Sequence, residues 1–382
     1  MSEPLIPPSL IAVAESDAAE GERTCRMSRE VVAAMARADL FRICVPHSLG
    51  GREATPGETI GAIETLAEAD GAAGWCLMIA ATSGIVAGWL PSDVARDVFS
   101  SADKPCGGVF APRGEAAAGQ DAYAVTGRWP FSSGVTHSAW MLGGCTVTDD
   151  GKPRLMASGA PDVHVLVFAR DQLRIDETWS VTGLRGTGSH DMVLEKAAVP
   201  LERSVSLLTG EPVEPGPLYA FPVFGLLAVG VAAVGLGIAR AALADFVTLA
   251  GAKKPSMSRR SLADHPSAQA TAANCWARLR SARALLREAV EDAWGEAQDR
   301  GSVSVLRRAG VRIAATHAAA ESAAVVEALC HAAGGSSIYT SSPLERRFRD
   351  VHTLRAHMII GPSTAELAGR VLLGAEADTT ML

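Results

Sequence analysis

The amino-acid sequence predicts a mainly α-helical α+β protein with three domains. Hydrophobic residues recur at helical spacing in about the first 100 residues, short β-rich runs fill residues 107–200, and helical spacing then persists to the end. Because strands do not alternate with helices, a parallel sheet of βαβ units is not expected. We therefore expect an α-helical domain at 1–104, a small β-barrel-like domain at 105–207 and a four-helix bundle at 208–382.

Composition agrees with this class and excludes several functions. Hydrophobic residues make up 48% of the 382 residues and aromatic residues only 5%, and alanine is abundant in the first and last thirds, as in long packed helices. The net charge of −7 offers no basic surface for nucleic acid. The seven cysteines have neither disulfide nor metal-site spacing, and the amino terminus lacks the pattern of a secretory signal, so a cytoplasmic protein without a metal is expected.

The first domain is predicted to consist of helices on both sides of one loop. Apolar residues follow the helical period at 31–35, at 60–66 and at 75–90. The segment Pro46–Pro56 contains two adjacent glycines and interrupts this pattern. An α-helical first domain follows from these observations.

The second domain is predicted from runs of β-branched and apolar residues. These runs are Tyr123–Thr126, Ala139–Val147, Val163–Ala169 and Met192–Val199. Glycine, aspartate and proline separate them, as is typical of turns between short strands. A connector rich in proline, glutamate and glycine, Leu208–Pro217, leads to the next helices.

Long segments with helical spacing predict the final bundle. They are Phe221–Ala250, Pro266–Arg300, Ser304–Ala333 and Leu344–Leu373. The apolar stretch Phe221–Ala239 is long enough to cross a membrane, but we interpret it as a buried bundle helix because it continues into an amphipathic segment. Its glycines are expected to allow close helix packing, since a dinucleotide-binding glycine motif must follow a strand.

Two pairs of motifs carry a family resemblance. The first pair is Gly127–Gly134 (GRWPFSSG) and Thr178–Asp191 (TWSVTGLRGTGSHD). The second pair is Gly334–Asp350 (GGSSIYTSSPLERRFRD) and Val351–His357 (VHTLRAH). With the α–β–α order, they resemble the acyl-CoA dehydrogenase superfamily over nearly the whole chain. Within it, the chain is most similar to the two-component, group D flavin-dependent monooxygenases, which implies the acyl-CoA dehydrogenase fold.

The resemblance implies a flavin site at the first motif. In the family, the segment that matches Trp129–Gly134 lies along the flavin ring, which assigns Ser133 to the position beside flavin N5 and C4a. Phe131, Ser132 and Gly134 would form the adjacent wall. Fixed donors suit reduced flavin because it carries anionic character. The alternative is that Phe-Ser-Ser-Gly is only a turn that ends a strand.

Two further segments would contact the flavin by the same resemblance. Trp179 and the loop Gly183–Ser189 would cover it, with a core tryptophan and a β-turn as the alternative. The family's Gly-Gly segment approaches the flavin of a neighbouring subunit. This resemblance assigns a cofactor role to Gly335, Ser336 and Ser337 and implies a homotetramer.

A basic residue near the end of the first bundle helix contacts the flavin phosphate in the family. Lys253 and Arg259 are the candidates here. The family's Arg-x-x-Phe pattern is absent, so both residues are assigned only by their place in the chain. A solvated charged surface is the alternative.

A dehydrogenase of this family needs a carboxylate base beside the flavin, and neither usual position carries one. The commoner base lies eight residues after the aspartate of the Arg-Asp motif, and counting from Asp350 reaches Met358. The other location corresponds to Tyr219–Phe221. His357 stands beside the first position, where several oxygenases of this branch have a histidine. There it would donate a hydrogen bond or a proton, or take a proton from the substrate.

The expected surroundings of His357 include a second histidine and an aromatic pocket. His352 lies about 140° away on an ideal helix, so the two cannot form a metal pair. It is expected in the substrate pocket or, alternatively, as a bundle histidine bonded to a neighbour. Thr353 and His357 are expected on one face of the same helix. Trp75 and Met78 are expected to line the pocket and to favour a planar substrate, with ordinary helix packing as the alternative.

Together these features predict the oxygenase component of a two-component flavin-dependent monooxygenase. By resemblance, it would take reduced FMN or FAD from a separate flavin reductase. It would then use O2, through a C4a-hydroperoxyflavin, to hydroxylate a small aromatic substrate. The alternatives are a dehydrogenase-like flavin oxidoreductase with its base elsewhere and a catalytically silent flavin-binding subunit.

Overall fold

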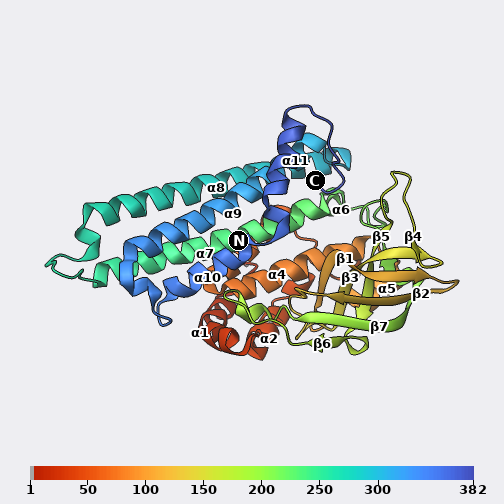
Figure 1. The fold of residues 1–382 in the computed structure, drawn as a ribbon, viewed down its shortest axis with the longest axis horizontal. Coiled ribbons are helices and arrows are strands. Elements are labelled where there is room, and N and C mark those ends of the chain that lie inside the picture. The colour runs from red at the N-terminus through yellow and green to blue at the C-terminus, as the bar shows by residue number, and fades with distance from the viewer. Residues whose placement is uncertain (1–3) are drawn as a thin grey trace. The chain divides into compact units, whose positions relative to one another are not determined.

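The computed structural model describes residues 4–382. Along the chain, helices come first, strands follow and long helices come last, which confirms the predicted mainly α-helical α+β class (Figure 1). The chain separates into two compact units. The first unit comprises the residues up to Thr55, Ile79–Ser180 and Arg185–Val223. The second unit comprises Pro56–Met78, Val181–Leu184 and Phe224–Leu382. The division into three domains stays a prediction.

The helices of the first unit are short and flank the strands in the chain. They include α1 (Pro8–Thr24), α2 (Arg29–Arg37), α5 (Ser92–Phe99) and α6 (Pro217–Ala220). Ser28 caps α2, because its hydroxyl oxygen accepts the N–H of Val31 at 3.2 Å. Inside the predicted loop Pro46–Pro56, one short 3₁₀ turn forms at His47–Leu49.

The strands of the first unit form one sheet. They are β1 (Cys106–Ala118), β2 (Ala122–Trp129), β3 (Trp140–Asp149), β4 (Lys152–Pro153), β5 (Val163–Ala169), β6 (Arg174–Asp176), β7 (Asp191–Pro200) and β8 (Ser204–Val205). Their order is β6-β7-β2-β1-β3-β5-β8, with β4 beside β3. Only the β1–β3 pair among these is parallel, and the other pairs are antiparallel. The predicted runs fall on β2, β3, β5 and β7.

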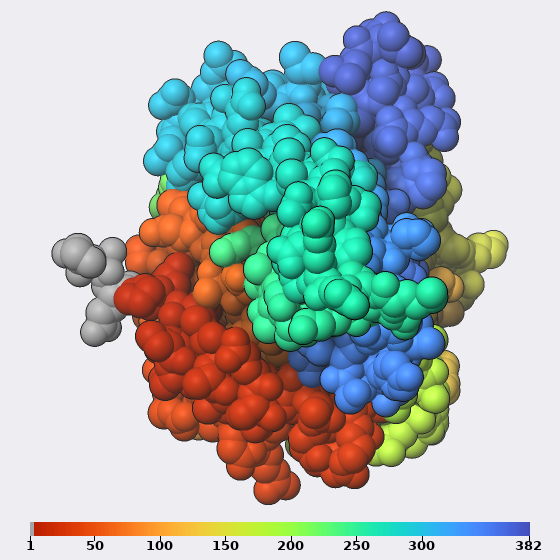
Figure 2. Space-filling model, turned by 90° about the vertical axis from the view of Figure 1, so that its left-hand side faces the viewer, coloured from red at the N-terminus to blue at the C-terminus, as the bar shows by residue number. Residues whose placement is uncertain are grey.

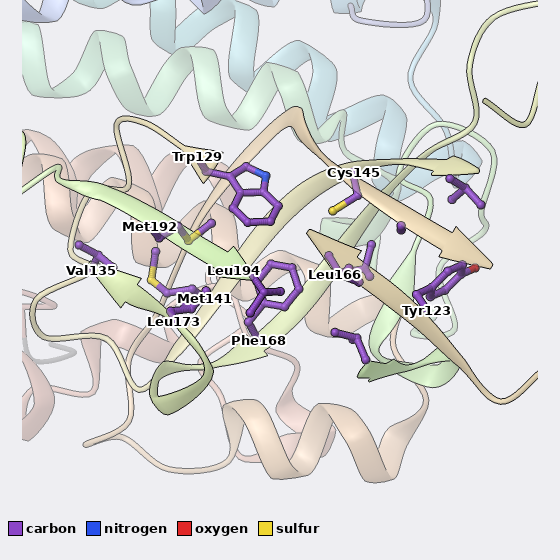
Figure 3. Close-up of a cluster of buried hydrophobic side chains, with 14 residues drawn as sticks. Tyr123, Trp129, Val135, Met141, Cys145, Leu166, Phe168, Leu173, Met192 and Leu194 are labelled. Atoms are coloured by element: carbon purple, nitrogen blue, oxygen red, sulfur yellow. The ribbon is translucent and has the colours of Figure 1, made fainter. Parts of the chain in front are cut away.

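The sheet buries a core that is centred on Trp129 (Figure 3). Its indole is fully buried, lies 5.3 Å from the Phe168 ring and donates its Nε1–H to the Gly144 carbonyl at 2.7 Å. The buried indole nitrogen is therefore satisfied. Because the side chain of Trp129 is enclosed by the sheet, any contribution that it makes to a cofactor site is indirect.

Strand β1 was absent from the predicted runs, and the Trp129 ring explains why. A Cβ atom on Gly114 of β1 would lie 2.3 Å from the indole, and one on Gly143 of β3 would lie 2.9 Å from it. These positions must be glycine so that the large ring can enter the sheet. In β1, Gly114 also removes a position at which a β-branched side chain would have helped to identify the strand in the sequence.

The second unit is built from long helices. They are α3 (Pro56–Ala69), the first part of α4 (Gly71–Gly84), α7 (Val223–Ala252), α8 (Pro266–Arg300), α9 (Val305–Ala333), α10 (Pro343–Arg355) and α11 (Pro362–Leu372). Three of the four predicted bundle segments match α7, α8 and α9. Figure 2 shows α8, coloured teal, at the surface of the face in view.

The fourth predicted bundle helix is wrong as a single element. The structure breaks it between Arg355 and Pro362, where a 3₁₀ turn spans Met358–Ile360. Gly361 precedes a proline and has an extended conformation, with ψ of 174°. A residue before proline is disfavoured in the α-helical region, so α10 and α11 form separately.

Gly230 and Gly237 of α7 pack against neighbouring elements of the second unit. A Cβ atom on Gly237 would lie 2.4 Å from the Glu64 carbonyl oxygen of α3, and one on Gly230 would lie 2.6 Å from Met78. By length and composition alone, α7, α9 extended to Ile338, and Gly71–Gly88 could cross a membrane. However, 83% of the apolar window of α7 is buried inside the fold. The interpretation of α7 as a buried helix with packing glycines is confirmed.

Candidate active site

The segment after β2 makes a tight turn in the first unit. Phe131 and Gly134 both adopt positive φ, 63° and 76°. This costs glycine little, whereas a residue with a Cβ loses roughly 1–2 kcal/mol. Ser132 Oγ donates to the Trp129 carbonyl at 2.8 Å and closes the turn. Phe131 is 68% exposed. Backbone strain of this kind is often retained at functional sites.

A second motif segment, at Thr187 and Ser189, forms hydrogen bonds with this turn. The N–H of Gly134 donates to the Thr187 carbonyl at 3.0 Å. The hydroxyl oxygens of Ser133 and Ser189 lie 2.7 Å apart although the residues are 56 positions apart in the chain, and Ser189 makes a second 2.7 Å contact with the Thr187 hydroxyl. Ser133, Ser189 and Thr187 are all buried. The fold therefore brings the first pair of family motifs together through a chain of three hydroxyls.

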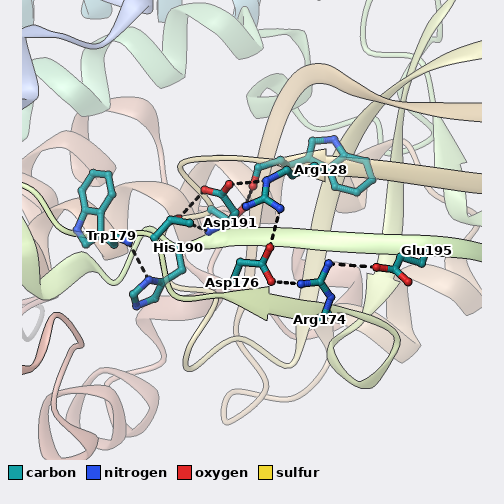
Figure 4. Close-up of polar contacts among 10 residues, drawn as sticks. Arg128, Arg174, Asp176, Trp179, His190, Asp191 and Glu195 are labelled. Carbon is teal, nitrogen blue, oxygen red and sulfur yellow. Dashed lines mark hydrogen bonds and ion pairs between the residues drawn. The ribbon is translucent and has the colours of Figure 1, made fainter.

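Trp179 stands beside Phe131. The two rings meet edge to face, with centroids 6.1 Å apart and planes at 86°. The backbone N–H of Trp179 donates to Nδ1 of His190 at 3.1 Å (Figure 4). The N–H of Ser132 donates to the His190 carbonyl, also at 3.1 Å. The structure thus places Phe131, Ser132, Ser133, Gly134 and Trp179 in one cluster.

Ion pairs anchor the strand that leads to Trp179. Arg128 contacts Asp176 at 2.6 Å and Asp191 at 2.8 Å (Figure 4). The Thr178 hydroxyl donates to the second Asp191 oxygen at 2.7 Å. The hydrogen bond from Arg128 lowers the pKa of Asp176. Because Asp191 begins β7 and directly follows His190, the segment 176–178 is tied to the chain next to His190.

His357 lies beyond the end of α10, in the second unit. The expectation that it shares a helical face with Thr353 is wrong, because α10 ends at Arg355 and His357 has an extended backbone, with φ of −71° and ψ of 127°. Its Nδ1 accepts the N–H of Ile359 at 3.2 Å. Burial lowers the pKa of His357 to about 4. The imidazole is therefore neutral at neutral pH, and its proton resides on Nε2.

Of the pocket candidates, the structure brings Trp75 to His357. Their rings meet edge to face, with centroids 5.6 Å apart. Met78 is fully buried and packs on Gly230 of α7. His352 is exposed on α10, where its ring lies 4.3 Å from that of Phe348.

The positions of a dehydrogenase base carry no carboxylate. Met358, the residue at the commoner position, is 73% exposed. Tyr219 is buried in the first unit, where its hydroxyl donates to the Cys44 carbonyl at 3.5 Å and burial raises its pKa. Neither residue can act as a base at neutral pH.

The remaining cofactor candidates, other than Arg259, lie near the end of α9. Gly335 is exposed and Ser336 is partly exposed, whereas the hydroxyl of Ser337 donates within its own turn to the Gly334 carbonyl at 2.9 Å. Lys253 Nζ donates to the Ala333 carbonyl at 2.5 Å and so caps the last turn of α9. Arg259 is exposed.

Comparison with known proteins identifies the family. A family model described as the acyl-CoA dehydrogenase N-terminal domain matches residues 12–91, and one described as the C-terminal domain matches residues 229–362. Indole-3-acetate monooxygenase of Pseudomonas putida is 32% identical over 93% of this chain and 89% of that protein. The chain belongs to the flavin-dependent monooxygenases of the acyl-CoA dehydrogenase family.

Other monooxygenases of this family agree with that assignment. The oxygenase component of FADH2-dependent resorcinol hydroxylase from a Rhizobium species is 26% identical, over 94% of this chain and 91% of that protein. The crystal structure of 3-HSA hydroxylase from Rhodococcus sp. RHA1 superimposes with a TM-score of 0.90 at 26% identity, over 98% of this chain and 97% of that one. The predicted monooxygenase class, its use of reduced flavin and the acyl-CoA dehydrogenase fold are confirmed.

Individual residues of the site were not identified in the sequence. Thr187 and Ser189 belong to the loop that was expected to cover the flavin, but their contact with Ser133 was not predicted, and His190 was given no role. The run of polar residues directly before β7 was the available signal. The sequence did not show which residues these side chains contact, because the contacts join segments that are distant in the chain.

Proposed function

We propose that this protein is the oxygenase component of a two-component monooxygenase that hydroxylates a small aromatic substrate. The observation that carries this proposal is the environment of His357, a neutral, partly buried imidazole that contacts Trp75 and stands next to the position where a dehydrogenase has its carboxylate. A neutral donor suits oxygen transfer to a substrate, whereas removal of a proton next to a thioester needs a base.

The first unit has groups that fit a flavin ring. Phe131 and Trp179 expose aromatic surface next to each other, and the Ser133 hydroxyl is the first of three linked hydroxyls. An exposed aromatic ring suits a planar cofactor, and a hydroxyl can donate to a ring nitrogen. Reduced flavin, when bound, supplies the electrons for the reaction of O2 with the substrate. In this proposal, Ser133 binds the polar edge of the ring while Phe131 and Gly134 shape the adjacent wall.

His357 acts as a hydrogen-bond donor in this proposal. Because Nδ1 accepts the Ile359 N–H, only Nε2–H is available to a reacting group. A pKa of about 4 makes the ring a weak proton acceptor at neutral pH, which disfavours the role of a general base. The edge of the Trp75 ring limits how the imidazole can turn. Of the roles left open by the sequence, donation is the one that these contacts favour.

Assembly and location are also part of the proposal. Ile338 and Tyr339, next to the Gly334–Ser337 turn, are 75% and 66% exposed. Large exposed apolar side chains next to each other are typical of surfaces that meet a partner. We infer that this turn contacts the flavin of a neighbouring subunit in a cytoplasmic homotetramer, and that Lys253 and Arg259 lie near the phosphate. A separate flavin reductase supplies the reduced FMN or FAD.

The test uses the purified protein with chemically reduced FMN or FAD, added in separate experiments. The mixture is exposed to ¹⁸O2 with indole-3-acetate or resorcinol, the compounds for which two relatives are named. Expected results are ¹⁸O in the product and flavin-dependent oxygen consumption. Reduction of bound flavin by an acyl-CoA would instead identify a dehydrogenase. Reoxidation of the reduced flavin by O2 at the same rate with and without the protein, with no ¹⁸O in the product, would identify a silent subunit.

A further inference from the structure

His190 connects the two segments of the cluster in the first unit, namely the Phe131–Gly134 turn and the segment at Trp179. Its backbone carbonyl accepts the N–H of Ser132, and its ring nitrogen Nδ1 accepts the N–H of Trp179, both at 3.1 Å. The residue is only 5% exposed and directly precedes β7. One buried residue thus sets the backbone positions of the Phe131–Gly134 turn and of Trp179.

The two contacts of His190 differ in how they respond to protonation. The carbonyl contact with Ser132 does not depend on the state of the ring. The contact with Trp179 requires an unprotonated Nδ1, so the proton of the neutral ring lies on Nε2. Nε2 is buried and has no hydrogen-bond partner among the described residues. A second proton on Nδ1 would place a donor against the donor N–H of Trp179.

Charged groups around His190 shift its pKa in opposite directions. Glu177 and Asp191 favour the protonated ring, and Arg26 disfavours it. Arg26 and Glu177 also pair with each other, so their effects on the ring partly cancel. Burial is the largest influence, and it lowers the pKa of His190 below its usual value of 6.5. The ring is therefore neutral at neutral pH and becomes charged only on acidification.

We propose that His190 is a positioning residue whose neutral ring holds Trp179 in register with the Phe131–Gly134 turn and whose protonation releases Trp179. The structural part of this inference needs no ligand. Its consequence for cofactor affinity rests on the proposed function, because it assumes that these two segments hold reduced flavin. Acidification should then weaken flavin binding because the hydrogen bond from Trp179 to His190 is lost, while the sheet stays folded.

The first test is hydrogen exchange at single amides in the protein without flavin. In His190→Ala the Trp179 amide should exchange about two- to tenfold faster, the loss expected for one hydrogen bond. The Ser132 amide should be unchanged, because its acceptor is the backbone carbonyl. In His190→Asn the side-chain oxygen can replace Nδ1, so protection should be retained. In the parent, protection of Trp179 beyond the intrinsic pH effect should fall on acidification, whereas in His190→Asn it should not.

A matched control is His164→Ala. His164 is a partly buried histidine of β5 whose Nδ1 contacts the Ser204 hydroxyl at 2.7 Å. This variant loses a similar hydrogen bond within the same sheet and should leave the Trp179 amide unaffected. Equal exchange of Trp179 in the parent and in His190→Ala would overturn the proposal. Faster exchange in both alanine variants would do the same, because it would report general loosening of the sheet.

The second test measures the affinity for reduced FMN under anaerobic conditions. His190→Ala should bind about two- to tenfold more weakly than the parent, and His190→Asn should bind like the parent at neutral pH and without the acid-dependent loss. If the exchange results hold but no variant binds reduced flavin, the proposed function fails while the positioning role stands. If all variants bind FMN with the same pH dependence, the link between His190 and the cofactor is wrong.

Discussion

Asp350 is a buried carboxyl whose ionisation should make stability depend on pH. It is 5% exposed, and one oxygen accepts the N–H of Leu184 at 2.6 Å. The pKa of Asp350 is raised from 3.8 to about 6, and burial is the largest cause. The charge of Asp70 also raises it, whereas the Leu184 hydrogen bond and the nearby arginines oppose the shift. At about 1.4 kcal/mol per unit, the shift corresponds to about 3 kcal/mol.

The sign follows from the raised pKa. The folded carboxyl binds a proton more tightly than the unfolded one, so its contribution to stability is fully present below pH 3.8 and is lost as the pH rises through about 6. Asp350→Asn keeps an oxygen for the Leu184 N–H and has no charge. The free energy of unfolding of the parent minus that of the variant should therefore fall by about 2 kcal/mol between pH 4.5 and pH 7.5.

The assay is urea unfolding followed by circular dichroism across this pH range. Taking the difference between the parent and the variant cancels the other titrating groups. The matched control is Asp121→Asn, which makes the same substitution at an exposed position. A pH-independent difference for Asp350→Asn would refute the reasoning, since it would mean that Asp350 is ionised equally easily in the folded and unfolded chain.

Three further predictions concern the site and the sheet. His357→Ala should retain its flavin affinity but lose product formation by about 10²–10³-fold, with hydrogen peroxide released instead, as assayed by product per oxygen consumed. Ser133→Ala should cost about 0.5–1.5 kcal/mol of stability and change the rate of flavin reoxidation in stopped-flow absorbance. Gly143→Ala should cost about 1–3 kcal/mol by thermal unfolding, because its Cβ would lie 2.5 Å from the Phe168 ring. Gly251→Ala, with open space around it, is the control.

Each of these three predictions has a result that contradicts it. An alanine variant of His357 that couples oxygen use to product as tightly as the parent would make it an ordinary packed histidine. An unchanged reoxidation rate would remove Ser133 from the flavin site. Equal stability of the Gly143 and Gly251 variants would mean that the Trp129 core tolerates an added methyl group.

Local patterns were sufficient for much of the fold. The strand runs on β2, β5 and β7 alternate or cluster β-branched residues, and the three longest helices have continuous helical spacing, so each was predictable from neighbours in the chain. Strand β1 was not, because Gly114 makes room for the Trp129 ring, which comes from another strand. The break before Pro362 had a local signal, the proline itself, whose effect on Gly361 outweighs the helical spacing around it.

The sequence by itself determined the chemical inventory of the site. It contains the family motifs in order, a histidine at position 357 and no carboxylate at either base position. Only the tertiary structure decided the protonation states and the hydrogen-bonding roles of these groups. The neutral form of His357, the acceptor role of His190 and the raised pKa of Asp350 depend on burial and on partners contributed by other segments. Desolvation and hydrogen bonding act through space, so the order of residues does not encode them locally.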